Sequence, residues 1–353
     1  MMLTHGVRQA LDFADRTIMP HQGTREDTAM NLPLEPKLKI GVQTIHRRSE
    51  PATAPWMPSI DEMRDFVELV DRCGFDSLWV GDHVSFPVAI LDPFLQLAQA
   101  AVVSRRLILG TAVYLLPLRH PAPVAKQVAT LDHLTEGHLI FGVGVGGEFP
   151  KEYEVCGVPL NERGARLSEA IPILRKLWSG APVSHPGGRY PAFDGVAMQP
   201  PPRQPGGPPI WFGGRSEGAL RRTGRLGDGW LAYVVTADMY AAALEKIAAA
   251  AAGREIMRFG TGHLLFTRLG RTYEEALEAA TISLSQRYAM DFRRAAERYA
   301  AVGPPERVAH SIRGFHAVGV RHVLLDIVGP YEDRHEQIRW IARDLLPLLA
   351  DLR

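Results

Sequence analysis

Asp82 and His83 are the first neighbouring residues in the sequence whose types could carry catalysis. They stand in the stretch WVGDHVSFP, directly after a short apolar run of the kind that forms a β-strand. A histidine in such a place can give or take a proton near neutral pH. The alternative is a capping aspartate beside a surface histidine. We predict an acid/base role for His83 because other candidate residues also follow apolar runs.

A glycine-rich turn, GVGVGGE, extends from Gly142 to Glu148. Its spacing matches the dinucleotide pattern GxGxxG through Gly142, Gly144 and Gly147. That pattern requires a helix that opens directly from the turn, whereas here Pro150 comes before any long helix. We interpret these glycines as residues that let the backbone approach a flat ring, with ordinary packing of a tight turn as the alternative.

A second glycine-containing turn, FGGRSEGALRR, leads into a predicted helix. Gly213, Gly214, Arg215 and Ser216 precede or open that helix. The free N–H groups at a helix start favour an anion, so this turn is a candidate phosphate site.

The same turn also matches the GxSxG pattern of serine hydrolases, from Gly214 to Gly218. Asp326 and His335 could complete a triad with Ser216. No HGGG-type segment for an oxyanion hole stands upstream. A Ser216 hydrolase is therefore kept as the weaker alternative.

Eight apolar runs must position these residues. They are short, rich in β-branched residues, and alternate with segments of helical period, which predicts repeated βα units around a parallel sheet. Eight such units predict an α/β fold, a closed (β/α)8 TIM barrel with insertions, whose functional residues lie where the strands end. The predicted strands are 38–44, 76–80, 107–113, 138–144, 209–214, 229–233, 262–269 and 322–328.

The barrel accounts for residues 37–353 as one domain. Residues 1–36 precede the first strand and are predicted to be a poorly ordered N-terminal extension. The stretch at about 179–209 is too rich in Pro and Gly for a helix and is predicted to be an insertion. An additional helical segment is expected at 290–305, before the last strand.

Composition excludes several classes of protein. Forty basic and 39 acidic side chains give a net charge of +1, and no basic block suggests a nucleic-acid partner. No apolar run is long enough for a membrane span or a signal peptide. Cys73 and Cys156 form no CxxC pair, which favours a reducing cytoplasm. No metal site is predicted, because the histidines lack HExxH or clustered carboxylate spacing.

Taken in order, four segments make the sequence resemble the luciferase-like monooxygenase family, especially its deazaflavin-dependent oxidoreductases that use coenzyme F-420. The segments are GFDSLWVGDH, RRLILGTAVYLLPLRHPAPVAKQVATLDHLTEGHLIFGVGVGGE, ERGARLSEAIPILRKLW and PIWFGGRSEGALRRTGRLGDGW. The likeness extends from about Leu38 to Leu352.

This resemblance implies a flavin-like ring over the end of the third strand, where the family commonly has a non-prolyl cis bond. By position that bond joins Ala112 and Val113. His83 matches the family's acid/base histidine, and either Glu148 or Glu152 could be its acidic partner. The residues expected to bind the cofactor are Asp82, Ala112, Val113, Val145, Gly146, Gly213, Gly214, Arg215 and Ser216.

The activity that the resemblance implies is hydride transfer between coenzyme F-420 and a small organic substrate. The alternative cofactor is FMN, in a two-component monooxygenase that uses molecular oxygen and a separate reductase. A barrel that binds flavin without catalysis is a third reading. Family members often form dimers, so a homodimer is expected. Trp56, Phe86, Tyr114 and Tyr233 could form an aromatic pocket wall.

Overall fold

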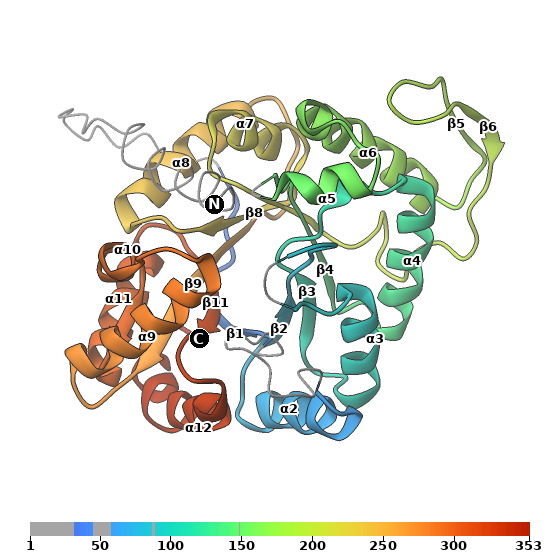
Figure 1. The fold of residues 1–353 in the computed structure, drawn as a ribbon. Coiled ribbons are helices and arrows are strands. Elements are labelled where there is room, and N and C mark those ends of the chain that lie inside the picture. Colours follow the sequence, from blue (N-terminus) through green and yellow to red (C-terminus); the bar gives the residue numbers. More distant parts are fainter. Residues whose placement is uncertain (1–31, 45–57, 87–88, 148) are drawn as a thin grey trace.

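The computed structural model describes residues 32–44, 58–86, 89–147 and 149–353, and they form a ring of helices around a central barrel (Figure 1). Parallel pairing runs from β1 through β2, β3, β4, β7 and β8 to β9, then through β11 back to β1. The pairing of β8 with β9 closes the ring. The barrel strands are β1 (Lys39–Gln43), β2 (Ser77–Val80), β3 (Ile108–Thr111), β4 (Leu139–Val143), β7 (Ile210–Gly213), β8 (Gly229–Tyr233), β9 (Gly260–Leu269) and β11 (His322–Ile327).

The eight predicted strands and the closed TIM barrel are thereby confirmed. Helices follow the strands and cover the outside of the barrel (Figure 1). The helices are α2 (Ile60–Arg72), α3 (Pro93–Val103), α4 (Pro121–Leu134), α5 (Pro150–Val155), α6 (Arg163–Trp178), α7 (Glu217–Leu226), α8 (Ala237–Ala250), α9 (Tyr273–Tyr288), α10 (Arg293–Tyr299), α11 (Pro305–Ala317) and α12 (Arg334–Trp340).

Two tryptophans fill part of the barrel interior. Trp79 and Trp211 lie with ring centroids 5.6 Å apart, and both are buried. They fit because neighbouring strands carry glycine where side chains would point inward. A Cβ at Gly110 would lie 2.4 Å from the Trp79 ring, and one at Gly260 would lie 2.1 Å from the Trp211 ring. The barrel is therefore packed, and it opens only toward its ends.

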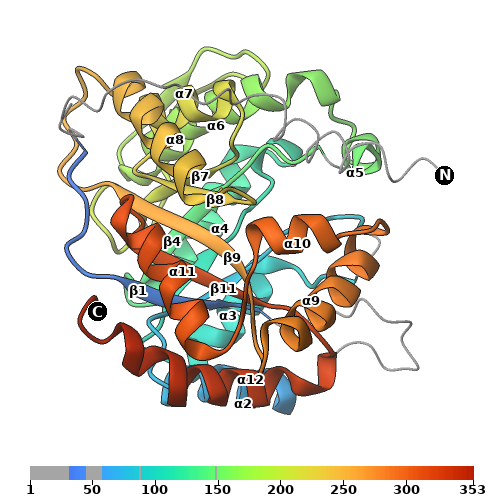
Figure 2. The same ribbon diagram turned by 90° about the vertical axis from the view of Figure 1, so that its left-hand side faces the viewer.

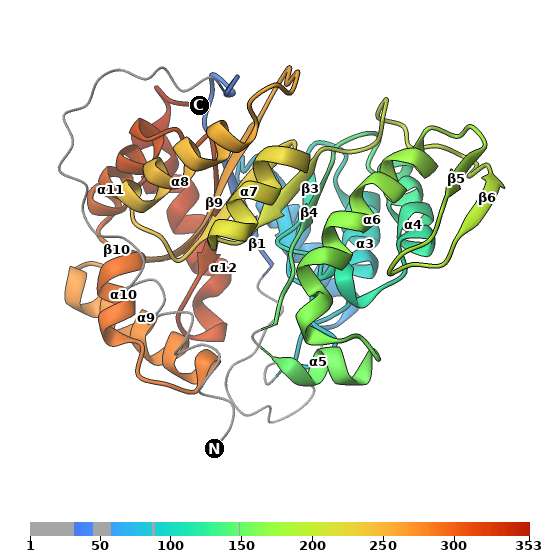
Figure 3. The same ribbon diagram turned by 90° about the horizontal axis from the view of Figure 1, so that it is seen from above.

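Two segments add to the barrel where the sequence predicted irregularity. The Pro- and Gly-rich stretch contains an antiparallel pair, β5 (Val183–His185) with β6 (Phe193–Val196), which projects at the edge of the molecule (Figure 3). The stretch before the last barrel strand contains α10 and a short strand, β10 (Ala301–Gly303), that pairs with β9.

The C-terminal segment does not continue α12 as one regular α-helix. After α12 the chain passes through a π-helical turn, Ile341–Leu345, and a 3-10 turn, Leu346–Leu349. Pro347 has no N–H to continue an α-helical ladder, which accounts for the change.

The short helix α5 and the pair α9 and α10 lie on the side where the strands end, whereas the C-terminus lies on the opposite side (Figures 2 and 3). At the N-terminal end of the described chain, Leu32 is buried and Leu34 forms a bridge with Phe259. Within the described ranges no helix is long and apolar enough to span a membrane.

Candidate active site

A cavity of about 260 Å³ opens at the C-terminal ends of the barrel strands. Its lining comes from two halves of the barrel mouth. One half follows β2, β3, β4 and β7, and it holds most of the predicted cofactor residues. The other half belongs to β8, β9, β11 and β1. The predicted residues in the lining are Asp82, His83, Ala112, Val113, Val145, Gly146, Gly213 and Gly214.

Val113 lines the first half of the cavity mouth, the half that follows β2, β3, β4 and β7. The Ala112–Val113 peptide bond is cis, as the resemblance implied. The Val113 side chain fits between two glycines, because a Cβ at Gly144 would lie 2.4 Å from it and one at Gly213 would lie 2.9 Å from it. These two glycines therefore make room for Val113, in addition to any approach of the backbone to a ligand.

The glycine turn after β4 has a packing reason at each position of the GxGxxG pattern. A Cβ at Gly142 would lie 1.9 Å from the carbonyl oxygen of Thr111, and Gly147 has a positive φ of 101° beside Arg163. The next helix, α5, begins only at Pro150. The turn is thus not the start of a dinucleotide-binding helix.

Gly214 and Ser216 stand at the start of α7. Gly214 has a φ of 107°, which a side chain would disfavour, and the Ser216 hydroxyl accepts the N–H of Ala219 as the helix cap. Arg215 turns away and donates to the carbonyl oxygens of Tyr233 and Val234. Arg215 and Ser216 lie outside the cavity lining.

His83 is held by a buried carboxylate. Its Nδ1 lies 3.0 Å from Oε2 and 3.1 Å from Oε1 of Glu152, which is 0% exposed. The same carboxylate accepts the N–H groups of Val84 and Ser85, at 2.7 and 3.2 Å. Because a carboxylate accepts, Nδ1 carries the hydrogen and Nε2 is the nitrogen available for chemistry. The imidazole also stacks on Phe86, with centroids 4.1 Å apart.

Helix α5 links this histidine to the glycine turn. Glu152 and Tyr153 are its two buried residues. The Tyr153 hydroxyl donates to the carbonyl oxygen of Val145, and burial raises the pKa of Tyr153 to about 12. One turn of helix therefore fixes both His83 and the backbone of the predicted cofactor loop.

The Asp82 carboxylate is occupied within the protein. Oδ2 accepts the N–H of Leu115 at 2.8 Å, and both oxygens accept from the guanidinium of Arg119. Burial opposes the charge of Arg119, but Asp82 raises its pKa above the ordinary value. Asp82 thus anchors the segment that follows the cis bond, and any contact with a cofactor would add to that role.

The second half of the mouth contains polar residues that the sequence analysis did not assign to it. They are Gln43 at the end of β1, Asp326 near the end of β11, and Arg287 and Tyr288 in the last turn of α9. Gln43 and Asp326 are polar residues within apolar strand segments, and this could have indicated that they face the mouth of the barrel. Nothing in the helical pattern of α9 indicated that Arg287 would line the cavity.

The predicted aromatic wall is correct only in part. Phe86 and Tyr233 line the cavity. Tyr114 does not: it is 3% exposed and stacks on Phe94 in the core, with centroids 4.5 Å apart. The prediction failed because Ala112 and Val113 both line the cavity, so the next side chain, Tyr114, packs into the core instead. Trp56 and the catalytic candidate Glu148 lie outside the described residues.

The hydrolase triad is not assembled. Ser216 is exposed and caps α7, Asp326 pairs with Arg287, and His335 stacks on Phe66 of the outer helix α2. No hydrogen bond in the described part of the chain joins these three candidates. No group of three or more His, Cys, Asp or Glu residues among the described residues could hold a metal ion.

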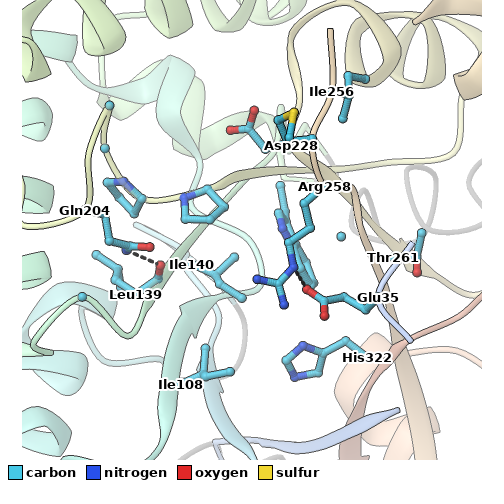
Figure 4. Close-up of a pocket in the computed structure, with 18 of the residues that line it drawn as sticks. Glu35, Ile108, Leu139, Ile140, Gln204, Asp228, Ile256, Arg258, Thr261 and His322 are labelled. Atoms are coloured by element: carbon cyan, nitrogen blue, oxygen red, sulfur yellow. Dashed lines mark hydrogen bonds and ion pairs between the residues drawn. The ribbon is translucent and has the colours of Figure 1, made fainter. Parts of the chain in front are cut away.

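A larger cavity, of about 630 Å³, lies at the opposite end of the barrel, where the strands begin (Figure 4). Several of its charged side chains are engaged in contacts within the protein. Arg258 pairs with Glu35 across the cavity, as Figure 4 shows. Arg254 donates to carbonyl oxygens at the end of α7, and Arg321 donates to one in the last turn of α11. The smaller cavity at the strand ends therefore remains the candidate active site.

The fold and this cavity define a (β/α)8-barrel protein with its candidate site at the carboxyl ends of the strands. A model of the luciferase-like monooxygenase family matches residues 38–322, and the chain belongs to that family.

This chain is similar to two relatives of different activity. The oxygenase component of the flavin-dependent trigonelline monooxygenase of Acinetobacter baylyi is 34% identical over 158 residues, 44% of this chain and 43% of that protein. The phthiodiolone/phenolphthiodiolone dimycocerosates ketoreductase of Mycobacterium kansasii is 33% identical over 242 residues, 60% of this chain and 65% of that protein. The matches thus span less than two thirds of each relative's length.

Among solved structures, an F-420-dependent secondary alcohol dehydrogenase in complex with an F-420–acetone adduct has a TM-score of 0.74. The alignment covers 89% of this chain and 99% of that one at 20% identity, so it supports the fold alone.

Proposed function

We propose that this protein is an oxidoreductase that transfers a hydride between coenzyme F-420 and a small organic substrate. The observation that carries the proposal is His83, fixed by the buried carboxylate of Glu152 in the same cavity that Ala112 and Val113 line. Membership in the luciferase-like family supports the class of reaction.

The residues present fit a flavin-like group. Ala112, Val113 and Val145 offer an apolar bed, and the glycines beside them bring the backbone close to the cavity. The N-terminus of α7, with Gly213 and Gly214 in front of it, would hold a phosphate. A bound deazaflavin supplies hydride transfer to or from a substrate carbon.

His83 then performs the proton transfer. Its Nδ1–H is committed to Glu152, so Nε2 exchanges a proton with the substrate oxygen. The Glu152 carboxylate holds the ring in position and stabilises the imidazolium. Glu152 is thus a positioning residue for His83, and Phe86 limits the rotation of the imidazole by stacking on it.

FMN is the second candidate cofactor. The trigonelline relative is a flavin-dependent oxygenase component, which favours a two-component monooxygenase with molecular oxygen and a separate reductase. The same apolar lining and the same helix start would hold FMN.

The deciding experiment is a parallel titration of the purified protein with coenzyme F-420 and with FMN. Fluorescence quenching gives each Kd, and retention through gel filtration confirms the complex. We expect selective binding of F-420. Selective binding of FMN would move the proposal to the monooxygenase, and binding of neither would contradict both.

We further infer that the protein acts in the cytoplasm as a homodimer. Cys73 and Cys156 are free thiols, which suits a reducing compartment. Leu95 and Val102 lie on one side of α3 and are 73% and 78% exposed, which suits burial against a second copy.

A further inference from the structure

Gln43, the last residue of β1, carries a buried hydrogen-bonding atom that the fold leaves unpaired. The residue is 2% exposed, and its Oε1 accepts no hydrogen bond from any described residue. Buried side-chain oxygens in folded proteins almost always have a hydrogen-bond partner. Gln43 belongs to the lining of the cavity at the strand ends. A donor on a molecule bound in this cavity would therefore complete its hydrogen bonding.

The register of β1 directs Gln43 into the barrel. Gln43 pairs with Trp79 of the neighbouring strand β2. Residues paired across neighbouring strands point to the same face of the sheet, and Trp79 packs in the barrel interior against Trp211. The Gln43 amide therefore also points inward, where the cavity begins.

The neighbours of Gln43 in the first half of the mouth have little or no side chain. A Cβ at Gly81 would lie 3.5 Å from Nε2 of Gln43 and 3.8 Å from the carbonyl oxygen of Ala112. Gly81 and Ala112 both line the cavity. Because a hydrogen atom and a methyl group are their only side chains, a flat ring that lies on this lining can bring its edge to the Gln43 amide.

Gln43 lies across the barrel from the proposed phosphate position. In the closed ring of strands, β2, β3 and β4 separate β1 from β7 on one side, and β11, β9 and β8 separate them on the other. Gly213 and Gly214, before α7, follow β7. A cofactor with its phosphate there, and its ring on Ala112 and Val113, therefore points the far part of the ring toward Gln43.

Flavins and deazaflavins share one ring edge that a primary amide can recognise. Their pyrimidine ring carries an imide N–H between two carbonyl oxygens. The glutamine oxygen can accept from that N–H, and the glutamine nitrogen can donate to a carbonyl oxygen beside it. The opposite end of the FMN ring carries methyl groups, which offer a buried oxygen no comparable donor.

We propose that Gln43 binds the imide edge of the flavin or deazaflavin ring and thereby determines which end of the ring points toward β1. Gln43 is then a cofactor-binding residue. This inference rests on the proposed function, because it assumes that a flavin-type ring occupies the cavity.

The test compares the cofactor that the protein retains, F-420 or FMN, with the same cofactor methylated at the imide nitrogen. Fluorescence quenching gives each Kd. We expect methylation to weaken binding to the wild type at least about tenfold, since the donor to Gln43 is lost. Gln43→Leu should bind the unmethylated cofactor about tenfold more weakly, and methylation should then change the Kd by less than about threefold.

Thermal unfolding of the cofactor-free protein separates this role from a structural one. Gln43→Leu removes a buried acceptor that lacks a partner, so the variant should melt at or above the wild-type temperature. Gln96→Leu is the matched control, because Gln96 is also buried but donates to the carbonyl oxygen of Leu91 at 2.9 Å. Gln96→Leu should melt below the wild type and bind the cofactor with a Kd within about twofold of the wild-type value.

Equal binding of the methylated and unmethylated cofactors by the wild type overturns the inference, and so does an equal effect of methylation in the wild type and in Gln43→Leu. Either result would place another edge of the ring, or a water molecule, at Gln43 and would leave the proposed function standing. A lower melting temperature of free Gln43→Leu, or its failure to fold, would also overturn the inference, since Gln43 would then be structural. Failure of the wild type to retain either cofactor contradicts the proposed function itself.

Discussion

At the residue scale, the contact between His83 and Glu152 makes the sharpest prediction. Glu152→Gln keeps an acceptor for the N–H of Val84 but removes the negative charge that holds and stabilises the imidazolium. We expect kcat to fall about 10- to 100-fold, with the Kd of the cofactor unchanged within about twofold. Steady-state kinetics and the fluorescence titration measure the two quantities on the same preparation.

Glu154 offers a matched control on the same helix. Its side chain is 68% exposed and pairs only with Lys151 in the described structure, 2.6 Å away. Glu154→Gln should leave kcat within about twofold, because exposed ion pairs of this kind contribute little. A similar loss of kcat in both variants, or a loss of cofactor affinity with Glu152→Gln alone, would show that α5 acts by general folding.

At the element scale, the sequence predicted what depends on local pattern. Short apolar runs located the eight barrel strands. The sequence did not predict the positions of side chains whose placement depends on tertiary contacts. Tyr114 packs against Phe94 in the core, and Arg287 reaches the mouth from a helix. Glu152 was a candidate from the sequence, but its burial against His83 was visible only in the folded chain.

The tryptophan-filled interior of the barrel makes a prediction about stability. A Cβ at Gly110 of β3 would lie 2.4 Å from the buried Trp79 ring, which has no room to move. Gly110→Ala should destabilise the fold by about 1–3 kcal/mol through overpacking. Thermal unfolding followed by circular dichroism measures the change.

Gly314 is the control for this substitution. It is exposed in α11, and an added Cβ would meet no atom within 4 Å. Gly314→Ala should instead stabilise the fold by about 0.5–1 kcal/mol, because alanine loses less backbone freedom in a helix. If both variants melted at the wild-type temperature, close packing of the strands around Trp79 would be refuted.

At the scale of the whole molecule, two buried histidines link stability to pH. Burial lowers the pKa of His263 from 6.5 to about 4, among the rings of Tyr240 and Phe315. Burial also lowers the pKa of His322 to about 3, and its Nε2 lies 2.6 Å from the hydroxyl of Ser77. Both imidazoles are therefore neutral in the folded protein at pH values where the unfolded chain is protonated.

The sign of the linkage follows from these pKa values. Between pH 6.5 and about 4 the unfolded chain binds a proton at His263 that the folded protein does not, so stability falls as the pH falls through this window. The total loss is about 3 kcal/mol for this one residue. His263→Gln, neutral at every pH, should reduce the loss of unfolding free energy between pH 7 and pH 4.5 measured with urea. His310→Gln on the exposed side of α11 serves as the control. Equal slopes for His263→Gln and the wild type would mean that His263 binds a proton as readily in the folded protein as in the unfolded chain.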